Sequence, residues 1–232
     1  MEKAFPYTLI DLTHPLNDQI PSWEESCGFK QEIVCDYSAS SETSFRVHHL
    51  SMNAGIGTHM DAPAHCIKGG KSIDQLPLSD LILPCVVIAP PNAFHPGYSL
   101  STKDIEQFED SYGPIEKGSF IALSTGWESL WYTPEKYRNN YLFPSVSSEA
   151  AELLLQRGIS GLGIDTLSPD RPESGFKVHQ LLLGSGLFIL ENIANLAKLP
   201  RKGSFILALP LNIQGGTESP IRLVALVPSL GG

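Results

Sequence analysis

Two histidines and an aspartate lie close together in a segment rich in glycine and proline. His59, Asp61 and His65 form the pattern H-x-D-x-P-x-H. Imidazole and carboxylate groups are the ligands that Zn²⁺ or Mn²⁺ takes in proteins. If the chain is extended here, His59 and Asp61 point the same way, because side chains alternate along a strand. The spacing therefore predicts a metal site, with unrelated loop residues as the alternative.

Two residues far along the chain could complete such a site. Glu191 ends an apolar run, 187–190, and a carboxylate beside buried surface is costly unless it is paired or binds a metal. His179 lies just before this run. A buried salt bridge is the alternative for Glu191, and an exposed helix position is the alternative for His179.

Other catalytic patterns are weak. The sequence has no G-x-S-x-G nucleophile elbow, no Walker loop and no G-x-G-x-x-G. Cys66 directly follows His65, and neighbours in sequence are rarely geometric partners, so a Cys/His pair is disfavoured. At most one of the adjacent His48 and His49 can face a common site, because side chains alternate along a strand.

Strands dominate the elements that must position these residues. Runs of apolar and β-branched residues predict strands, several of them buried on both faces. These runs are 8–12, 45–52, 85–89, 120–123, 159–164, 187–190, 205–209 and 221–227.

Helices are fewer. Ser101 and Asp104 have the spacing of a capping box and predict a helix after them. Ser147 or Ser148 is expected to cap a second helix, which stops at Gly158. A third helix is expected over 178–183. The pattern predicts a strand-rich α/β fold with mixed sheets.

Bulk composition narrows the class of protein. The 232 residues, 42% of them hydrophobic, suit one globular domain over 1–232. A net charge of −9 disfavours nucleic-acid or anionic-membrane partners. No apolar run of membrane-spanning length and no signal peptide are visible. The four cysteines lack paired ligand spacing, so free thiols and a cytoplasmic location are expected.

The segment 55–65 resembles the motif H-x-G-T-H-x-D-x-P-x-H of the cyclase family of metal-dependent hydrolases, which includes bacterial kynurenine formamidases and isatin hydrolases. Further similar segments are 10–16, 21–23, 124–127, 163–168, 191–196, 209–216 and 219–220. The resemblance implies a swivelling β/β/α domain, a small-molecule substrate, and assembly as a homodimer or homotetramer.

The resemblance also implies a metal centre, usually of two ions in this family. His59 matches a ligand of the first metal, and Asp61 matches the carboxylate that bridges both metals. His179 matches a ligand of the second metal, and Glu191 matches a further shared carboxylate.

Other matches concern catalysis, and one position departs from the motif. His65 matches the proton-transfer residue, and Trp23 stands where the formamidases place an aromatic that contacts substrate. Gly55 replaces the family's first histidine, so the first metal lacks a ligand. The site could hold one metal, water could fill the gap, or Asn53 could be the replacement ligand.

The expected activity is hydrolysis of a small amide, either N-formyl or cyclic, with one or two Zn²⁺ or Mn²⁺ ions. A divalent metal lowers the pKa of bound water and polarises a carbonyl, and His65 would pass a proton to the leaving nitrogen. One alternative is a non-catalytic binding or regulatory protein with incomplete metal loading. The other is a purely structural metal with saturated coordination.

Overall fold

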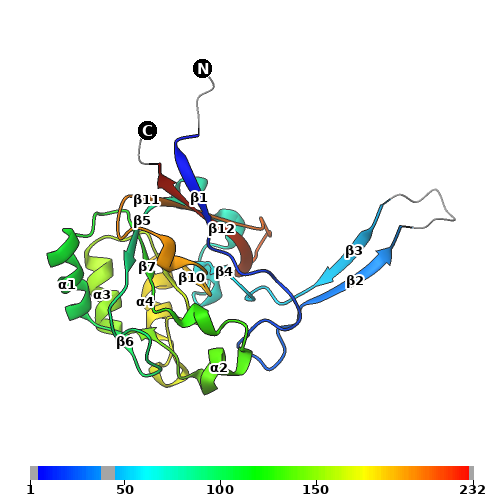
Figure 1. The fold of residues 1–232 in the computed structure, drawn as a ribbon, viewed down its shortest axis with the longest axis horizontal. Helices are drawn as coiled ribbons and strands as arrows, with labels where there is room; N and C mark the ends of the chain where they lie inside the picture. The colour runs from blue at the N-terminus through cyan, green and yellow to red at the C-terminus, as the bar shows by residue number, and fades with distance from the viewer. Residues whose placement is uncertain (1–4, 38–44, 230–232) are drawn as a thin grey trace.

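The centre of the fold is a sheet of eight strands that closes on itself. The computed structural model describes residues 5–37 and 45–229 (Figure 1). The strand order is β1-β12-β11-β5-β7-β9-β10-β4, and β4 pairs again with β12, so the sheet forms a barrel with β1 added at its edge. The strands are β1 (Tyr7–Asp11), β4 (His59–Asp61), β5 (Ile82–Ile88), β7 (Phe120–Leu123), β9 (Gly161–Ile164), β10 (Phe188–Glu191), β11 (Ser204–Pro210) and β12 (Glu218–Pro228).

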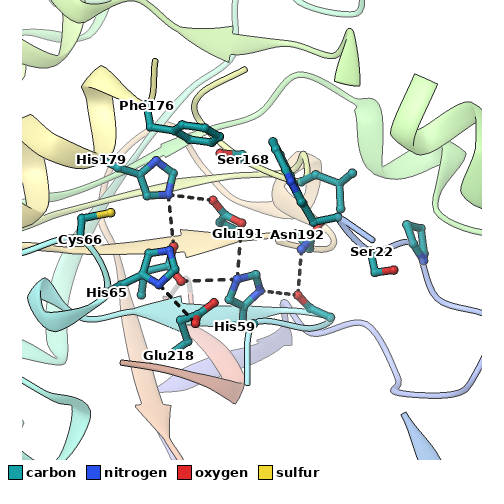
Figure 2. A pocket seen from close by; sticks show the side chains of 16 residues that line it. Ser22, His59, His65, Cys66, Ser168, Phe176, His179, Glu191, Asn192 and Glu218 are labelled. Atoms are coloured by element: carbon teal, nitrogen blue, oxygen red, sulfur yellow. Dashed lines mark hydrogen bonds and ion pairs between the residues drawn. The ribbon is translucent and has the colours of Figure 1, made fainter. Parts of the chain in front are cut away.

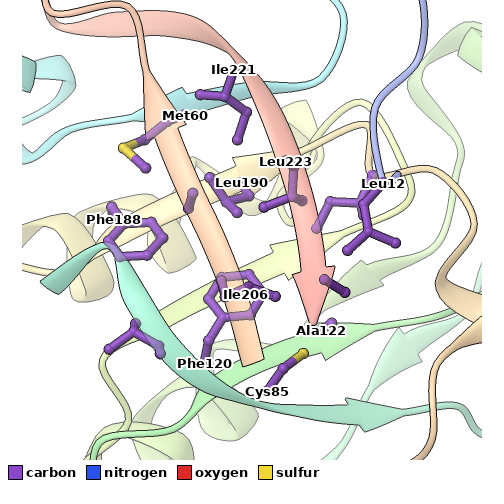
Figure 3. Packing of buried hydrophobic residues seen from close by; sticks show 14 of the residues in the cluster. Leu12, Met60, Cys85, Phe120, Ala122, Phe188, Leu190, Ile206, Ile221 and Leu223 are labelled. Atoms are coloured by element: carbon purple, nitrogen blue, oxygen red, sulfur yellow. The ribbon is translucent and has the colours of Figure 1, made fainter. Parts of the chain in front are cut away.

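The central barrel strands are buried on both faces, as their apolar runs predicted. On β5, Cys85 and Val87 pack inside the barrel, whereas Val86 and Ile88 pack against the surrounding helices. Figure 3 shows the inner cluster, where Phe120 of β7 lies among side chains from other barrel strands. Alternate residues of one strand therefore stabilise two separate cores, which explains why these runs show no polar alternation.

Four α-helices lie in the described part of the chain: α1 (Thr102–Tyr112), α2 (Pro134–Arg138), α3 (Ser148–Gln156) and α4 (Lys177–Gly184). Buried residues of α1, α3 and α4 cover the outer face of the barrel. The predicted cap Ser101 is confirmed, because it accepts the amide N–H of Asp104. Of the two residues predicted to cap the second helix, Ser147 is the cap, because it accepts the amide N–H of Ala150. The sequence does not predict α2, since five residues are too few to show a helical period. No helix among residues 5–37 and 45–229 is both long and apolar enough to cross a bilayer.

Two smaller strand pairs lie outside the barrel. Strands β2 (Lys30–Cys35) and β3 (Val47–Ser51) pair antiparallel and extend away from the body of the molecule (Figure 1). Strand β3 falls in a predicted run, whereas β2 is exposed and too polar to be predicted from its pattern. Strands β6 (Ser99–Leu100) and β8 (Ser145–Val146) form a short parallel pair. The strand-rich α/β architecture agrees with the expected fold class.

Candidate metal centre and active site

Strand β4 presents two polar side chains on one face. Met60 at its centre packs in the barrel core, so His59 and Asp61 point to the opposite side. In the antiparallel pairings, His59 lies directly opposite Glu191 of β10, and Asp61 lies directly opposite Glu218 of β12. Opposed residues of antiparallel strands project to the same face. Three neighbouring strands therefore direct four polar side chains to one place.

His179 joins this group from α4. Nε2 of His59 lies 3.5 Å from Oδ1 of Asp61 and 3.4 Å from Oε2 of Glu191. Nε2 of His179 lies 3.5 Å from Oδ2 of Asp61 and 3.4 Å from Oε1 of Glu191. Each carboxylate thus turns one oxygen toward each imidazole, and Figure 2 shows the Glu191 carboxylate joined to both rings. The structure brings together the four residues that the sequence predicted as metal ligands.

The orientation of both imidazoles is set by the partners of their Nδ1 atoms. Nδ1 of His59 lies 2.9 Å from the carbonyl oxygen of Gly57, and Nδ1 of His179 lies 2.8 Å from Oδ2 of Asp170. An acceptor at Nδ1 holds the proton there and leaves the Nε2 lone pair free to bind a metal. Both Nε2 atoms face carboxylate oxygens. A cation held by the nitrogens and the oxygens together would accept lone pairs from both kinds of atom.

Asp61 shows that a cation fits this space. Its side chain is buried, and its Oδ1 has no hydrogen-bond partner within the described ranges. An unpartnered carboxylate oxygen in the interior is costly. Two imidazoles and two carboxylates are also the donors that zinc or manganese prefers. The residues present therefore fit a divalent metal.

Mutual charges shift the pKa values of these groups. Burial opposes protonation of His59, but the carboxylates of Asp61 and Glu191 outweigh burial and raise its pKa. Burial also opposes protonation of His179, yet its hydrogen bonds to Asp170, Asp61 and Glu191 raise its pKa well above the usual value. Burial, together with the charge of Asp61, raises the pKa of Glu191. Because metal ligands must be unprotonated, a metal bound here would compete with protons for the two imidazoles and for Glu191.

His65 lies at the rim of the donor group. It ends the short 3-10 turn Pro63–His65, and its ring centroid is 6.0 Å from that of His179. Nδ1 of His65 lies 3.2 Å from Oε2 of Glu218, and this hydrogen bond raises the pKa of His65. With about a third of its side chain exposed, His65 is placed to exchange protons with a bound molecule.

A cavity of about 460 Å³ lies over the donors. All four predicted metal ligands line it, together with His65, and Trp23 and Phe176 form an aromatic part of its wall. The Trp23 and Phe176 ring centroids are 5.7 Å apart. Tyr141 packs against Trp23 at 4.7 Å between centroids and supports it. The cavity can therefore hold a small planar molecule beside the metal donors.

The space next to Gly55 is taken by Glu218. A Cβ atom at position 55 would collide with Oε1 of Glu218 and would lie 3.4 Å from Nε2 of His59. Asn53, the predicted replacement ligand, is exposed, and its carboxamide packs beside Gly28. Asn53 lines a neighbouring surface hollow and not the main cavity.

Three residues of the site were not singled out from the sequence. Asp170 orients His179, and no sequence signal indicated it. Asn192 holds the loop before β4, because its Nδ2 donates to the Gly57 carbonyl at 2.9 Å. Asn192 lies in the family-like segment 191–196, and Glu218 lies between two C-terminal segments that resemble the family, 209–216 and 219–220. Those two resemblances were the signals available.

Solved structures share this fold. Isatin hydrolase A from Ralstonia solanacearum matches with a TM-score of 0.87 at 29% identity, over 95% of this chain and 92% of that chain. An isatin hydrolase bound to the product analogue thioisatinate matches with a TM-score of 0.88 at 28% identity, over 97% and 94% of the two chains. Together with the donor set, the similarity to these isatin hydrolases identifies the chain as a metal-dependent amide hydrolase.

Sequence comparison identifies the family. A family model described as "Putative cyclase" matches residues 10–171. The isatin hydrolase of Roseibium aggregatum is 35% identical over 187 residues, which is 74% of this chain and 71% of the relative. The kynurenine formamidase of Bacillus cytotoxicus is 27% identical over 216 residues, or 93% and 95% of the two chains. The chain belongs to the putative cyclase family.

Proposed function

We propose that this enzyme hydrolyses a cyclic amide fused to an aromatic ring, a substrate of the isatin type. The observation that carries the proposal is the shared cavity, in which the aromatic wall of Trp23 and Phe176 lies beside the metal donors. The isatin hydrolases among the similar proteins support it. An N-formyl aryl amide is the second candidate, favoured by the kynurenine formamidase that matches 93% of the chain.

Each part of the cavity has a role in this reaction. His59, Asp61, His179 and Glu191 would hold one or two ions of Zn²⁺ or Mn²⁺. When bound, the divalent metal lowers the pKa of a water and polarises the substrate carbonyl. Water adds to the carbonyl carbon, the C–N bond breaks, and His65 supplies the proton to the leaving nitrogen. The products are a carboxylate and an arylamine on one molecule.

The geometry disfavours the alternative of a purely structural metal. A structural site saturates its metal with protein ligands, whereas a catalytic site keeps an open position. Here the donors line an open cavity rather than enclosing one another. Trp23 and Phe176 line the same cavity, so a substrate held against them would bring its carbonyl to the donors.

The test is removal and return of the metal. The protein is dialysed against chelator, reloaded with Zn²⁺ or Mn²⁺, and assayed with isatin and with N-formylkynurenine. We expect chelation to abolish hydrolysis, a metal to restore it, and isatin to be the better substrate. His59→Ala should resist restoration. Activity that survives chelation, or that never appears with either metal on either amide, would overturn the proposal.

Assembly and location are also part of the proposal. We infer a homodimer or homotetramer, because the extended β2–β3 pair exposes apolar side chains such as Ile33 and Leu50, 53% and 52% accessible. Light scattering after gel filtration would measure the mass of the assembly, and a monomer would contradict the inferred oligomer.

The four cysteines, all within the described residues, are unpaired. This supports a reducing compartment such as the cytoplasm.

A further inference from the structure

One carboxylate of the cavity is not among the four predicted ligands. Glu218 begins β12 and points to the same face as Asp61 and His59. Donor atoms of these three residues all lie within 4.8 Å of one another. Such a group of one imidazole and two carboxylates has the size and the chemistry of a divalent-cation site.

The position of Glu218 matches the place of a missing side chain. A Cβ atom at position 55 would meet Oε1 of Glu218 and would lie close to Nε2 of His59. A long side chain at 55 would therefore reach the same space beside His59 that the Glu218 carboxylate now occupies. Glycine at 55 is what allows Glu218 to lie there, because any larger residue would displace the carboxylate.

The register of the strands adds an independent argument. Asp61 and Glu218 face each other directly across the β4–β12 pair, and like charges in this arrangement destabilise a sheet. Oδ1 of Asp61 is also buried without a hydrogen-bond partner in the part of the chain that the structure describes. Nδ1 of His65 lies 3.2 Å from Oε2 of Glu218, whereas Oε1 is the oxygen that lies beside Gly55 and His59.

We propose that Glu218 is a metal ligand that replaces the side chain absent at position 55, so that His59, Asp61 and Glu218 form the first metal position. This extends the proposed function, since it assumes a metal-dependent site. A carboxylate oxygen is a chemically harder ligand than an imidazole nitrogen, so this exchange favours Mn²⁺ relative to Zn²⁺. Glu218 would also connect this metal to His65 through its second oxygen.

Direct metal binding tests this without any substrate. Titration calorimetry with Mn²⁺, elemental analysis and the Mn²⁺ electron paramagnetic resonance spectrum are compared for the wild type, Glu218→Ala and Glu218→Gln. We expect Glu218→Ala to lose one Mn²⁺ or to weaken its binding at least about tenfold. Glu218→Gln keeps one oxygen but loses the charge, so its Mn²⁺ affinity should lie between those of the wild type and Glu218→Ala.

Thermal melting separates a ligand from a structural residue. Without metal, Glu218→Ala should melt at about the same temperature as the wild type, because it removes a like-charge contact with Asp61 and also the partly exposed hydrogen bond to His65. The increase in melting temperature on adding Mn²⁺ should shrink, because binding stabilises only the state that holds the ligand. A lower melting temperature in chelator, with Mn²⁺ affinity kept, would mean that Glu218 is structural.

Restoring the histidine provides the sharpest test. Gly55→His alone should weaken Mn²⁺ binding, because the new side chain collides with Glu218. Combined with Glu218→Ala, it should bind metal better than either single variant, with the ratio of Zn²⁺ to Mn²⁺ affinity raised about tenfold or more. Such non-additivity is expected of residues that occupy one position, because each single variant leaves that position either crowded or empty.

Two controls complete the design. Asn53→Ala removes the rival ligand, and Glu24→Ala removes an exposed carboxylate from the same hollow that Glu218 lines; both should bind Mn²⁺ like the wild type. The proposal would be overturned if Glu218→Ala binds Mn²⁺ as the wild type does, or if Asn53→Ala loses Mn²⁺ and Glu218→Ala does not. Either result would count against it even if isatin is hydrolysed. Loss of Mn²⁺ in Glu218→Ala would support it even if no amide is a substrate, so the two proposals fail separately.

Discussion

The carboxylate of Asp170 holds both the side chain and the backbone of His179. Oδ2 of Asp170 lies 2.8 Å from Nδ1 of His179 and also accepts the backbone N–H of His179 at 2.9 Å. Its other oxygen accepts the N–H of Val178 and the hydroxyl of Ser174. One carboxylate thus caps the start of α4 and fixes the ring that points to the metal donors.

Asp170→Asn should therefore weaken metal binding without removing a ligand. An amide cannot hold both N–H groups of His179 as a carboxylate does, and loss of such support lowers metal affinity about 10–100-fold. Calorimetry with Zn²⁺ or Mn²⁺ measures the change, and kcat/KM should fall with it. Asp80→Asn at an exposed position is the control. Wild-type affinity in Asp170→Asn would contradict the positioning role.

His65→Gln should separate proton transfer from metal binding. We expect kcat to fall about 10²–10⁴-fold while the bound metal, measured by elemental analysis, stays the same. The hydrogen bond to Glu218 raises the pKa of His65 above the usual 6.5. A proton donor is lost as the pH rises through that pKa, so the wild-type rate should decline on an alkaline limb that the variant lacks. If metal is lost along with activity, His65 is a ligand instead.

Trp23→Ala should act on substrate binding. Removing the aromatic face should raise KM about tenfold, which corresponds to about 1.4 kcal/mol, and leave metal content unchanged. Trp23→Phe keeps an aromatic face and should retain most of the affinity. Steady-state kinetics with isatin measure both. A large fall in kcat with KM unchanged would show that Trp23 acts on the transition state and not on binding.

His14 should make the protein sensitive to acid. Its ring is buried and stacks on Trp131 with 3.9 Å between centroids, and burial lowers the pKa of His14 to about 4. The unfolded chain binds this proton near pH 6.5, so stability is lost as the pH falls from about 6.5 to 4, by up to about 3 kcal/mol.

His14→Phe should flatten this dependence, because a phenyl ring keeps the stacking and does not titrate. Urea unfolding in chelator at pH 7 and at pH 4.5 measures the free energy of unfolding of both proteins. His95→Gln, at an exposed histidine, should retain the wild-type slope. An equal loss of stability in His14→Phe and in the wild type would assign the acid sensitivity to other groups.

Local features of this chain could be predicted from its sequence. Side-chain period and caps are properties of neighbouring residues, so the runs that became β7 and β10, and the caps Ser101 and Ser147, were predicted correctly. These features depend on backbone conformation and on which faces are apolar, and both are encoded within a few residues. The extended conformation of β4 was only a condition of the sequence argument, because three residues are too few to show a strand period, and the structure supplied it.

The partners of β4 were decided only by the tertiary structure. Hydrophobic period shows which residues face a core, but it does not show which strand lies alongside or in what register. Closure of the barrel places β10 on one side of β4 and β12 on the other, and so puts Glu191 opposite His59 and Glu218 opposite Asp61. The sequence showed that position 55 lacks a histidine, and the folded chain placed Glu218 beside it, because strand pairing brings together residues that are distant in the chain.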